Sequence, residues 1–71
     1  MKTNDGYEVK AGMMISTMLD DDVAYQIQSV SDDTAVYHEY IWNEEDEDFK
    51  ATGDGGLLWA EEIENLFVYM I

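Results

Sequence analysis

The sequence predicts a small α+β domain, in which a curved antiparallel sheet or a small barrel of four or five strands carries one short helix near the C-terminus. The chain has 71 residues, enough for one domain (1–71) with one small core. Apolar and polar residues alternate with a period of two through the first two-thirds of the chain, as in half-buried strands. Helical spacing of apolar residues appears only after position 57.

The first predicted strand covers residues 9–19. Its odd positions form the apolar face, which holds Val9, Ala11, Met13, Ile15 and Leu19. We expect a bend at Gly12, because glycine adopts backbone angles that other residues avoid. The aspartates at 20–22 end this strand, and a second alternating strand begins at Val23.

A hairpin joins the second strand to a third strand over residues 35–43. The intervening segment 31–34 is a turn by composition, since aspartate tolerates turn backbone angles. If Asp32 and Asp33 form a two-residue loop, the numbers of opposite residues sum to 65. One face of the hairpin then pairs Ile27 with His38, Tyr25 with Tyr40 and Val23 with Trp42, and the other pairs Gln26 with Glu39 and Gln28 with Tyr37. In this register His38 faces the core, where we expect a hydrogen-bonded structural histidine.

The segment 43–48 predicts an exposed loop, because it contains five consecutive acidic residues. A short strand over 49–52 and a glycine-rich turn over 53–56 follow it. Helical spacing then favours a short helix over 59–66 with a final strand after it, and the alternative is one helix over 57–71. This order of elements resembles SH3-like barrels, in which a helical turn precedes the closing strand. The resemblance implies nothing about function, because one fold serves many functions.

Charge is the dominant feature of the composition. Seventeen acidic residues face three lysines and no arginine, which gives a net charge of −14, whereas a small domain usually carries a net charge of magnitude about 2–8. Like charges repel one another and destabilise the compact state, so we expect the charge to serve a purpose. Its sign argues against binding to nucleic acid or to an anionic membrane. Hydrophobic residues make up 46% of the chain, which favours a folded domain over disorder.

The sequence also limits compartment and chemistry. It contains no cysteine, so a disulfide framework and a thiolate metal site are excluded. Its start is polar, unlike a signal peptide, and its longest purely apolar run, 66–71, is far shorter than a membrane span. We therefore expect a cytoplasmic protein. No nucleophile motif surrounds the serines, and so short a chain has little room for a dry cleft, so we expect no enzyme, no cofactor and no metal requirement.

The hairpin register predicts where the acidic residues lie. Antiparallel pairing places 20–22 and 44–48 at one end of the sheet and Asp32 and Asp33 at the other, roughly 30 Å away at about 3.4 Å per residue. A third group lies on the helix. Each acidic run alone is typical of a solvated loop, but carboxylates at fixed spacings imitate the phosphates of DNA. The candidate partner-binding residues are Asp20, Asp21, Asp22, Asp32, Asp33, Glu44, Glu45, Asp46, Glu47, Asp48, Glu61, Glu62 and Glu64.

These acidic runs, in a very short chain without arginine, resemble phage-encoded DNA mimics. The resemblance is compositional and implies no particular fold. It implies that the chain occupies the nucleic-acid-binding surface of a basic host protein and inhibits its DNA binding, in the cytoplasm of the host cell. Proteins inhibited by such mimics include HU-type nucleoid-associated proteins, restriction enzymes, CRISPR effectors, uracil-DNA glycosylase and RNA polymerase. An HU-type partner is favoured, because its basic surface is small and largely indifferent to sequence.

Two alternative functions and one mode of assembly remain open. The first alternative is an acidic adaptor or assembly module for a basic protein unrelated to nucleic acid. The second is a weak calcium site shared by 20–22 and 44–48, although the EF-hand spacing is absent there. In the predicted register Tyr37 and Ile41 lie on the outer face of the hairpin, and a homodimer through this pair would double the acidic array.

Overall fold

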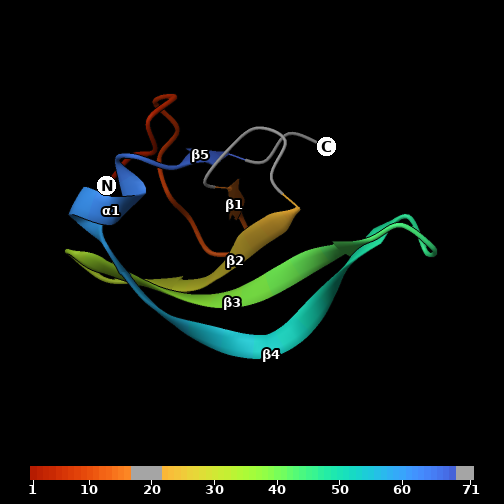
Figure 1. The fold of residues 1–71 in the computed structure, drawn as a ribbon. Helices are drawn as coiled ribbons and strands as arrows, with labels where there is room; N and C mark the ends of the chain where they lie inside the picture. Colours follow the sequence, from red (N-terminus) through yellow and green to blue (C-terminus); the bar gives the residue numbers. More distant parts are fainter. Residues whose placement is uncertain (17–21, 69–71) are drawn as a thin grey trace.

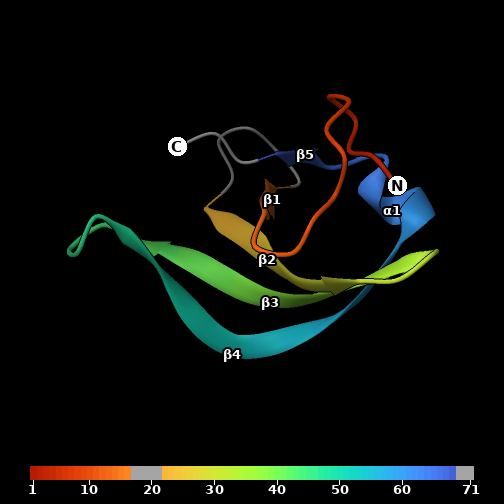
Figure 2. The same ribbon diagram turned by 180° about the vertical axis from the view of Figure 1, so that it is seen from behind.

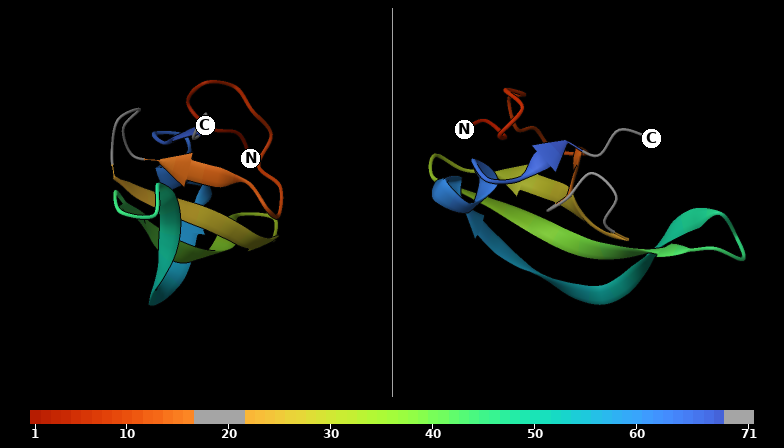
Figure 3. Two further views of the ribbon diagram at one scale, coloured as in Figure 1. Left: turned by 90° about the vertical axis from the view of Figure 1, so that its right-hand side faces the viewer. Right: turned by 45° about the horizontal axis from the view of Figure 1, so that its top comes forward.

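The protein is an open, five-stranded antiparallel sheet with one short helix, in a computed structural model that describes residues 1–16 and 22–68 (Figure 1). The strands lie in the order β4-β3-β2-β1-β5, so β4 and β5 form the two edges of the sheet. The elements are β1 (Met14–Ser16), β2 (Val23–Val30), β3 (Thr34–Asn43), β4 (Asp48–Trp59), α1 (Ala60–Ile63) and β5 (Phe67–Val68). The predicted curved sheet and short C-terminal helix are confirmed. Seen end-on in Figure 3, the strands are strongly twisted relative to one another.

The hairpin between β2 and β3 turns where the sequence predicts. The Ser31 backbone N–H donates to the Thr34 carbonyl oxygen at 2.8 Å, which closes a two-residue loop over Asp32 and Asp33. Next to the turn, Val30 lies opposite Ala35, in the predicted register.

A β-bulge at Gln28 then shifts the register by one residue. Ser29 lies opposite Val36, but Ile27 lies opposite Tyr37, so the predicted pairing of Ile27 with His38, and the pairs beyond it, are wrong. The bulge leaves the polar Gln28 exposed while Ile27 remains buried. His38 consequently lies opposite Gln26 and is exposed, and its predicted place in the core is also wrong.

The N-terminal segment, α1 and β5 cover the concave face of the sheet (Figures 1 and 2). The core takes residues from the N-terminal segment, α1 and strands β1–β4. It consists of Val9, Ile15, Ile27, Ala35, Leu58, Ile63 and Leu66. Tyr37 packs against this cluster, and its ring lies 4.6 Å from that of Tyr25, centroid to centroid. The shifted register thus turns Tyr37 inward, and its predicted place on the outer face is wrong. Of the pair predicted to form a homodimer, Tyr37 and Ile41, only Ile41 is classed as exposed, at 45%.

Strand β4 runs without interruption for 12 residues, where the sequence predicted a short strand at 49–52 and a turn at 53–56. His38 pairs with Gly55 and Tyr40 with Ala51, so the three residues 52–54 stand opposite Glu39 alone. Gly53 adopts a φ of +89° in this bulge. The glycines therefore bend an edge strand instead of reversing the chain, and the predicted turn is wrong.

The N-terminal segment enters the sheet through a turn. Gly12 has a φ of +93° and donates its backbone N–H to the Ile27 carbonyl oxygen at 2.7 Å, which confirms the predicted bend. Strand β1 begins only at Met14, so the predicted strand start at Val9 is wrong, although Val9 and Ile15 are buried as expected. Ala11 is exposed, contrary to its predicted place on the apolar face, and Leu19 lies outside the described residues.

The C-terminal third contains a helix followed by a strand, as the sequence favours, and the helix is shorter than predicted. Helix α1 spans four residues, with the backbone N–H of Glu64 donating to the Ala60 carbonyl oxygen at 3.0 Å. Strand β5 then pairs antiparallel with β1, placing Phe67 opposite Ser16. Within the described residues, none of the helices is long and apolar enough to cross a membrane.

Candidate protein-binding surface

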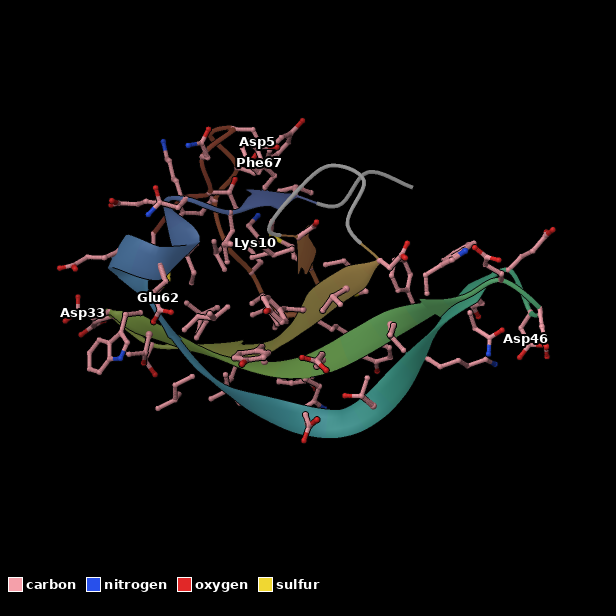
Figure 4. The ribbon with its side chains drawn as sticks, in the orientation of Figure 1. Asp5, Lys10, Asp33, Asp46, Glu62 and Phe67 are labelled. Atoms are coloured by element: carbon pink, nitrogen blue, oxygen red, sulfur yellow. The ribbon has the colours of Figure 1, made fainter. Side chains whose placement is uncertain are left out.

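Most of the acidic residues that the structure describes lie at the two ends of an elongated molecule, whose principal extents are 37 × 23 × 16 Å. Figure 4 labels Asp46 at one end and Asp33 and Glu62 at the other. We call the first the turn end, made of Asp22 and 44–48 in the described residues, and the second the helix end, made of Asp32, Asp33, Glu61, Glu62 and Glu64. Asp20 and Asp21 lie outside the described residues.

The helix acids, predicted as a third separate group, join the hairpin acids. The backbone N–H of Ala60 donates to the Asp33 carbonyl oxygen at 2.8 Å, which holds the start of α1 against the β2–β3 turn. At the other end, the Trp42 N–H donates to the Asp22 carbonyl oxygen at 2.8 Å. That bond confirms the predicted proximity of Asp22 to the loop that follows β3.

The turn end is held in one conformation by its own side chains. The Asn43 side-chain oxygen accepts the backbone N–H groups of Glu45 at 2.9 Å and Asp46 at 3.2 Å. Behind the turn, the rings of Trp42 and Phe49 pack edge to face, with centroids 5.2 Å apart. The exposed carboxylates of this turn are therefore presented on an ordered support.

Very little positive charge compensates these carboxylates. In the described part of the chain, two ion pairs occur: Lys50 Nζ lies 3.3 Å from Asp46 Oδ2, and the amino terminus lies 3.4 Å from Glu8 Oε1. Both acidic partners are more than half exposed, so each pair contributes little to stability. Glu47, in the same turn, adopts a left-handed φ of +50°. The turn end thus combines concentrated like charge with an unfavourable backbone conformation.

At the helix end, some carboxylates have structural roles and others have none. The Glu62 Oε1 atom accepts the Trp59 backbone N–H at 3.2 Å, which is one half of a capping box. The other half is missing because the Trp59 indole has no acceptor. The carboxylates of Asp33 and Glu61 make no hydrogen bond or ion pair with the described residues. A cavity of about 390 Å³ is lined by the residues Asp33, Trp59, Ala60 and Glu61.

A second cavity of about 450 Å³ lies along β3 and β4, where the bulge carries β4 away from its neighbour. Glu39 lines it, and its Oε1 atom accepts the Thr52 hydroxyl at 3.1 Å. His38 and Asp54 also line this cavity. None of these three residues was among the sequence-predicted candidates, because the cavity exists only through the bulge.

Asp5 forms a separate acidic feature beside β5. Its Oδ1 atom accepts the Thr3 hydroxyl and, at 3.4 Å, the Val68 backbone N–H. The hydrogen bond from the Thr3 hydroxyl, together with the backbone N–H groups of Asp5 and Val68, lowers the pKa of the Asp5 carboxyl below its ordinary value. Asp5 therefore connects the N-terminal loop to the edge of the sheet, which is a structural role.

The arrangement as a whole is suited to binding a cationic surface. Within residues 1–16 and 22–68, no group of three or more histidine, cysteine, aspartate or glutamate side chains is placed to hold a metal ion. The predicted calcium site includes Asp20 and Asp21, outside those ranges, and stays a prediction. No protein-family model, curated protein or solved structure matches the chain, so the surface itself is the basis for assigning a function.

Proposed function

We propose that the protein is a DNA mimic, which binds the nucleic-acid-binding surface of a basic host protein and inhibits its DNA binding. The partner we favour is an HU-type nucleoid-associated protein. The observation that carries the proposal is the concentration of carboxylates at both ends of a molecule 37 Å long, with very few cations to compensate them.

The charge density of the molecule supports this proposal. Spread along the 37 Å axis, a net charge of −14 amounts to roughly one charge per 3 Å. One strand of duplex DNA carries one charge per about 3.4 Å of axis, and both strands together one per about 1.7 Å. The average charge density of the protein therefore lies between that of one strand and that of the duplex. Lysine and arginine side chains that bind phosphate also form charge-assisted hydrogen bonds with carboxylate.

An HU-type partner fits what this surface offers. Such proteins bind DNA through its backbone and its deformability, with few contacts that depend on sequence. A mimic of that DNA needs correctly spaced charge and no imitation of base edges. The described residues provide such charge at two sites, the turn end and the helix end, which lie at opposite ends of the long axis.

The test is competition for a purified HU-type protein, measured by the fluorescence anisotropy of a labelled duplex. The wild-type chain should displace the duplex, and added salt should weaken the displacement steeply. Neutralising Glu44, Glu45 and Glu47 to glutamine should raise the inhibitory concentration by about tenfold or more, as each lost contact costs a charge-assisted hydrogen bond.

The matched control for this experiment neutralises three carboxylates elsewhere: Glu8→Gln, Glu39→Gln and Asp54→Asn. This variant has the same net charge as the turn variant, so it should inhibit nearly as well as the wild-type chain. Equal losses for the two variants would mean that net charge alone matters and that the turn end is not the contact. A wild-type chain that leaves the duplex bound at low salt would refute the proposal.

One observation favours the second candidate, an acidic adaptor for a basic protein unrelated to nucleic acid. Leu57 and Trp59 are each 57% exposed on β4, and the sugar–phosphate backbone that a mimic imitates has no comparable apolar patch. An adaptor would capture its partner equally well in the presence of excess duplex, whereas a mimic would lose it.

A further inference from the structure

Strands β3 and β4 carry an apolar patch on the face of the sheet opposite the core. Val36, Leu57 and Trp59 are 39%, 57% and 57% exposed, respectively. Leu57 and Trp59 flank the buried Leu58, so they point away from the core, and Val36 lies directly opposite Leu57. We call these three residues the outer patch. In the part of the chain that the structure describes, no element packs against this face (Figures 1 and 2).

Trp59 belongs both to the outer patch and to the cavity at the helix end, and two hydrogen bonds fix the backbone at this point. Glu62 accepts the Trp59 N–H at 3.2 Å, and the next residue, Ala60, donates its N–H to the Asp33 carbonyl oxygen at 2.8 Å. The indole of Trp59 therefore projects from a fixed backbone. Asp33 and Glu61 line the same cavity of about 390 Å³ as Trp59.

We propose that the outer patch is the docking surface for the basic partner, and that the Trp59 cavity holds an arginine side chain of that partner. This inference rests on the proposed function, and it names the residues that would favour an arginine of the partner over a lysine. A guanidinium is planar and weakly hydrated, so it stacks on an indole and forms paired hydrogen bonds with carboxylates. Leu57 and Val36 provide apolar contact for the aliphatic part of the same surface.

Charge complementarity favours a basic partner over a second copy of this chain. Two copies joined through the outer patch would bring the Asp33 and Glu61 carboxylates of one copy toward those of the other. Each chain carries a net charge of −14, so such a dimer would concentrate like charge on both sides of a small apolar contact. A surface rich in arginine instead pairs with those carboxylates and covers the indole.

The first test measures the cavity directly with two synthetic peptides, ten arginines and ten lysines, at equal ionic strength. A Trp42→Phe background leaves Trp59 as the only indole, so its emission reports binding. The arginine peptide should bind more tightly than the lysine peptide. Trp59→Ala in the wild-type background, followed by anisotropy of labelled peptide, should lower the affinity for arginine about two- to fivefold and remove most of the difference.

Matched variants distinguish binding in the Trp59 cavity from a change in net charge or in stability. Asp33→Asn combined with Glu61→Gln should also reduce the preference for arginine, while Trp59→Phe should retain part of it. Tyr7→Ala removes another exposed aromatic, 48% accessible on the N-terminal loop, and should change nothing. The thermal midpoint of each variant, measured by circular dichroism, verifies that it folds. Equal binding of both peptides, unaffected by Trp59→Ala in a folded protein, would overturn the inference.

The second test links the cavity to the proposed function through displacement of duplex from a purified HU-type protein. If the wild-type chain displaces the duplex and Trp59→Ala does so equally well, the mimic stands and the docking surface is refuted. If the peptides show the arginine preference but the wild-type chain leaves the duplex in place, the DNA-mimic function is refuted and the cavity belongs to an adaptor. The two failures therefore give different results.

Discussion

Glu47 offers a sharp test of how the turn end is built. Its φ of +50° lies in the left-handed region, where a side chain bearing a Cβ costs roughly 1–2 kcal/mol. Glycine relieves this strain but loses about 0.5–1 kcal/mol through the greater freedom of the unfolded chain. We therefore expect Glu47→Gly to raise the free energy of unfolding by about 0.5–1 kcal/mol, a few degrees in Tm for a domain of this size.

Removal of charge has to be separated from removal of strain. Glu47→Gln keeps the Cβ and removes the same negative charge, so any stabilisation it brings comes from reduced repulsion and should disappear in about 0.5 M NaCl. Urea unfolding followed by circular dichroism, at low salt and at about 0.5 M NaCl, gives both contributions. Equal stabilities of the glycine and glutamine variants at high salt would refute the assignment of backbone strain to Glu47.

Three further predictions concern single contacts. Glu62→Ala should lower stability by about 0.5–1 kcal/mol through loss of the bond to the Trp59 N–H, whereas Glu62→Gln should keep most of it; thermal denaturation compares them. Gly55→Ala should cost about 1–3 kcal/mol, because a Cβ there would lie 2.5 Å from the Tyr37 carbonyl oxygen. Gly56→Ala, whose Cβ would meet the Tyr37 ring at 3.5 Å, should be tolerated, and urea titration would show both. The lowered pKa of folded Asp5 means that its contribution is present near neutral pH and is lost as pH falls through that folded pKa. The stability difference between the wild-type chain and Asp5→Asn should therefore disappear in acid, and a constant difference would contradict this role for the carboxylate.

Local chemistry in the sequence predicts the turns and the order of the elements, because the deciding residues act on their own backbone. The loop over Asp32 and Asp33 and the bend at Gly12 are of this kind. The two bulges were not predicted, since an alternating pattern contains no signal for an extra residue. One bulge at Gln28 was enough to exchange Tyr37 and His38 between the two faces.

The candidate surface, like the fold, was predictable where local sequence determines it and not where tertiary contacts do. Acidic runs next to predicted turns lie at the ends of the sheet, so the positions of Asp32, Asp33 and 44–48 follow from the hairpin. The helix acids lie beside Asp33 because α1 packs against the β2–β3 turn. This is a tertiary contact, which local sequence patterns do not predict. The outer patch could have been found from the three consecutive apolar residues Leu57, Leu58 and Trp59, because a strand points neighbouring side chains to opposite faces, had the glycines before them not indicated a turn.

The open edge at β4 has a consequence for solubility. An edge strand of 12 residues presents backbone groups that another strand could pair with, a common route to aggregation. The bulge at 52–54 bends this edge strand, and electrostatic repulsion between copies opposes the approach of a second one. Salt or acid weakens that repulsion, so the chain should begin to self-associate in the same conditions that would weaken the proposed binding of a basic partner.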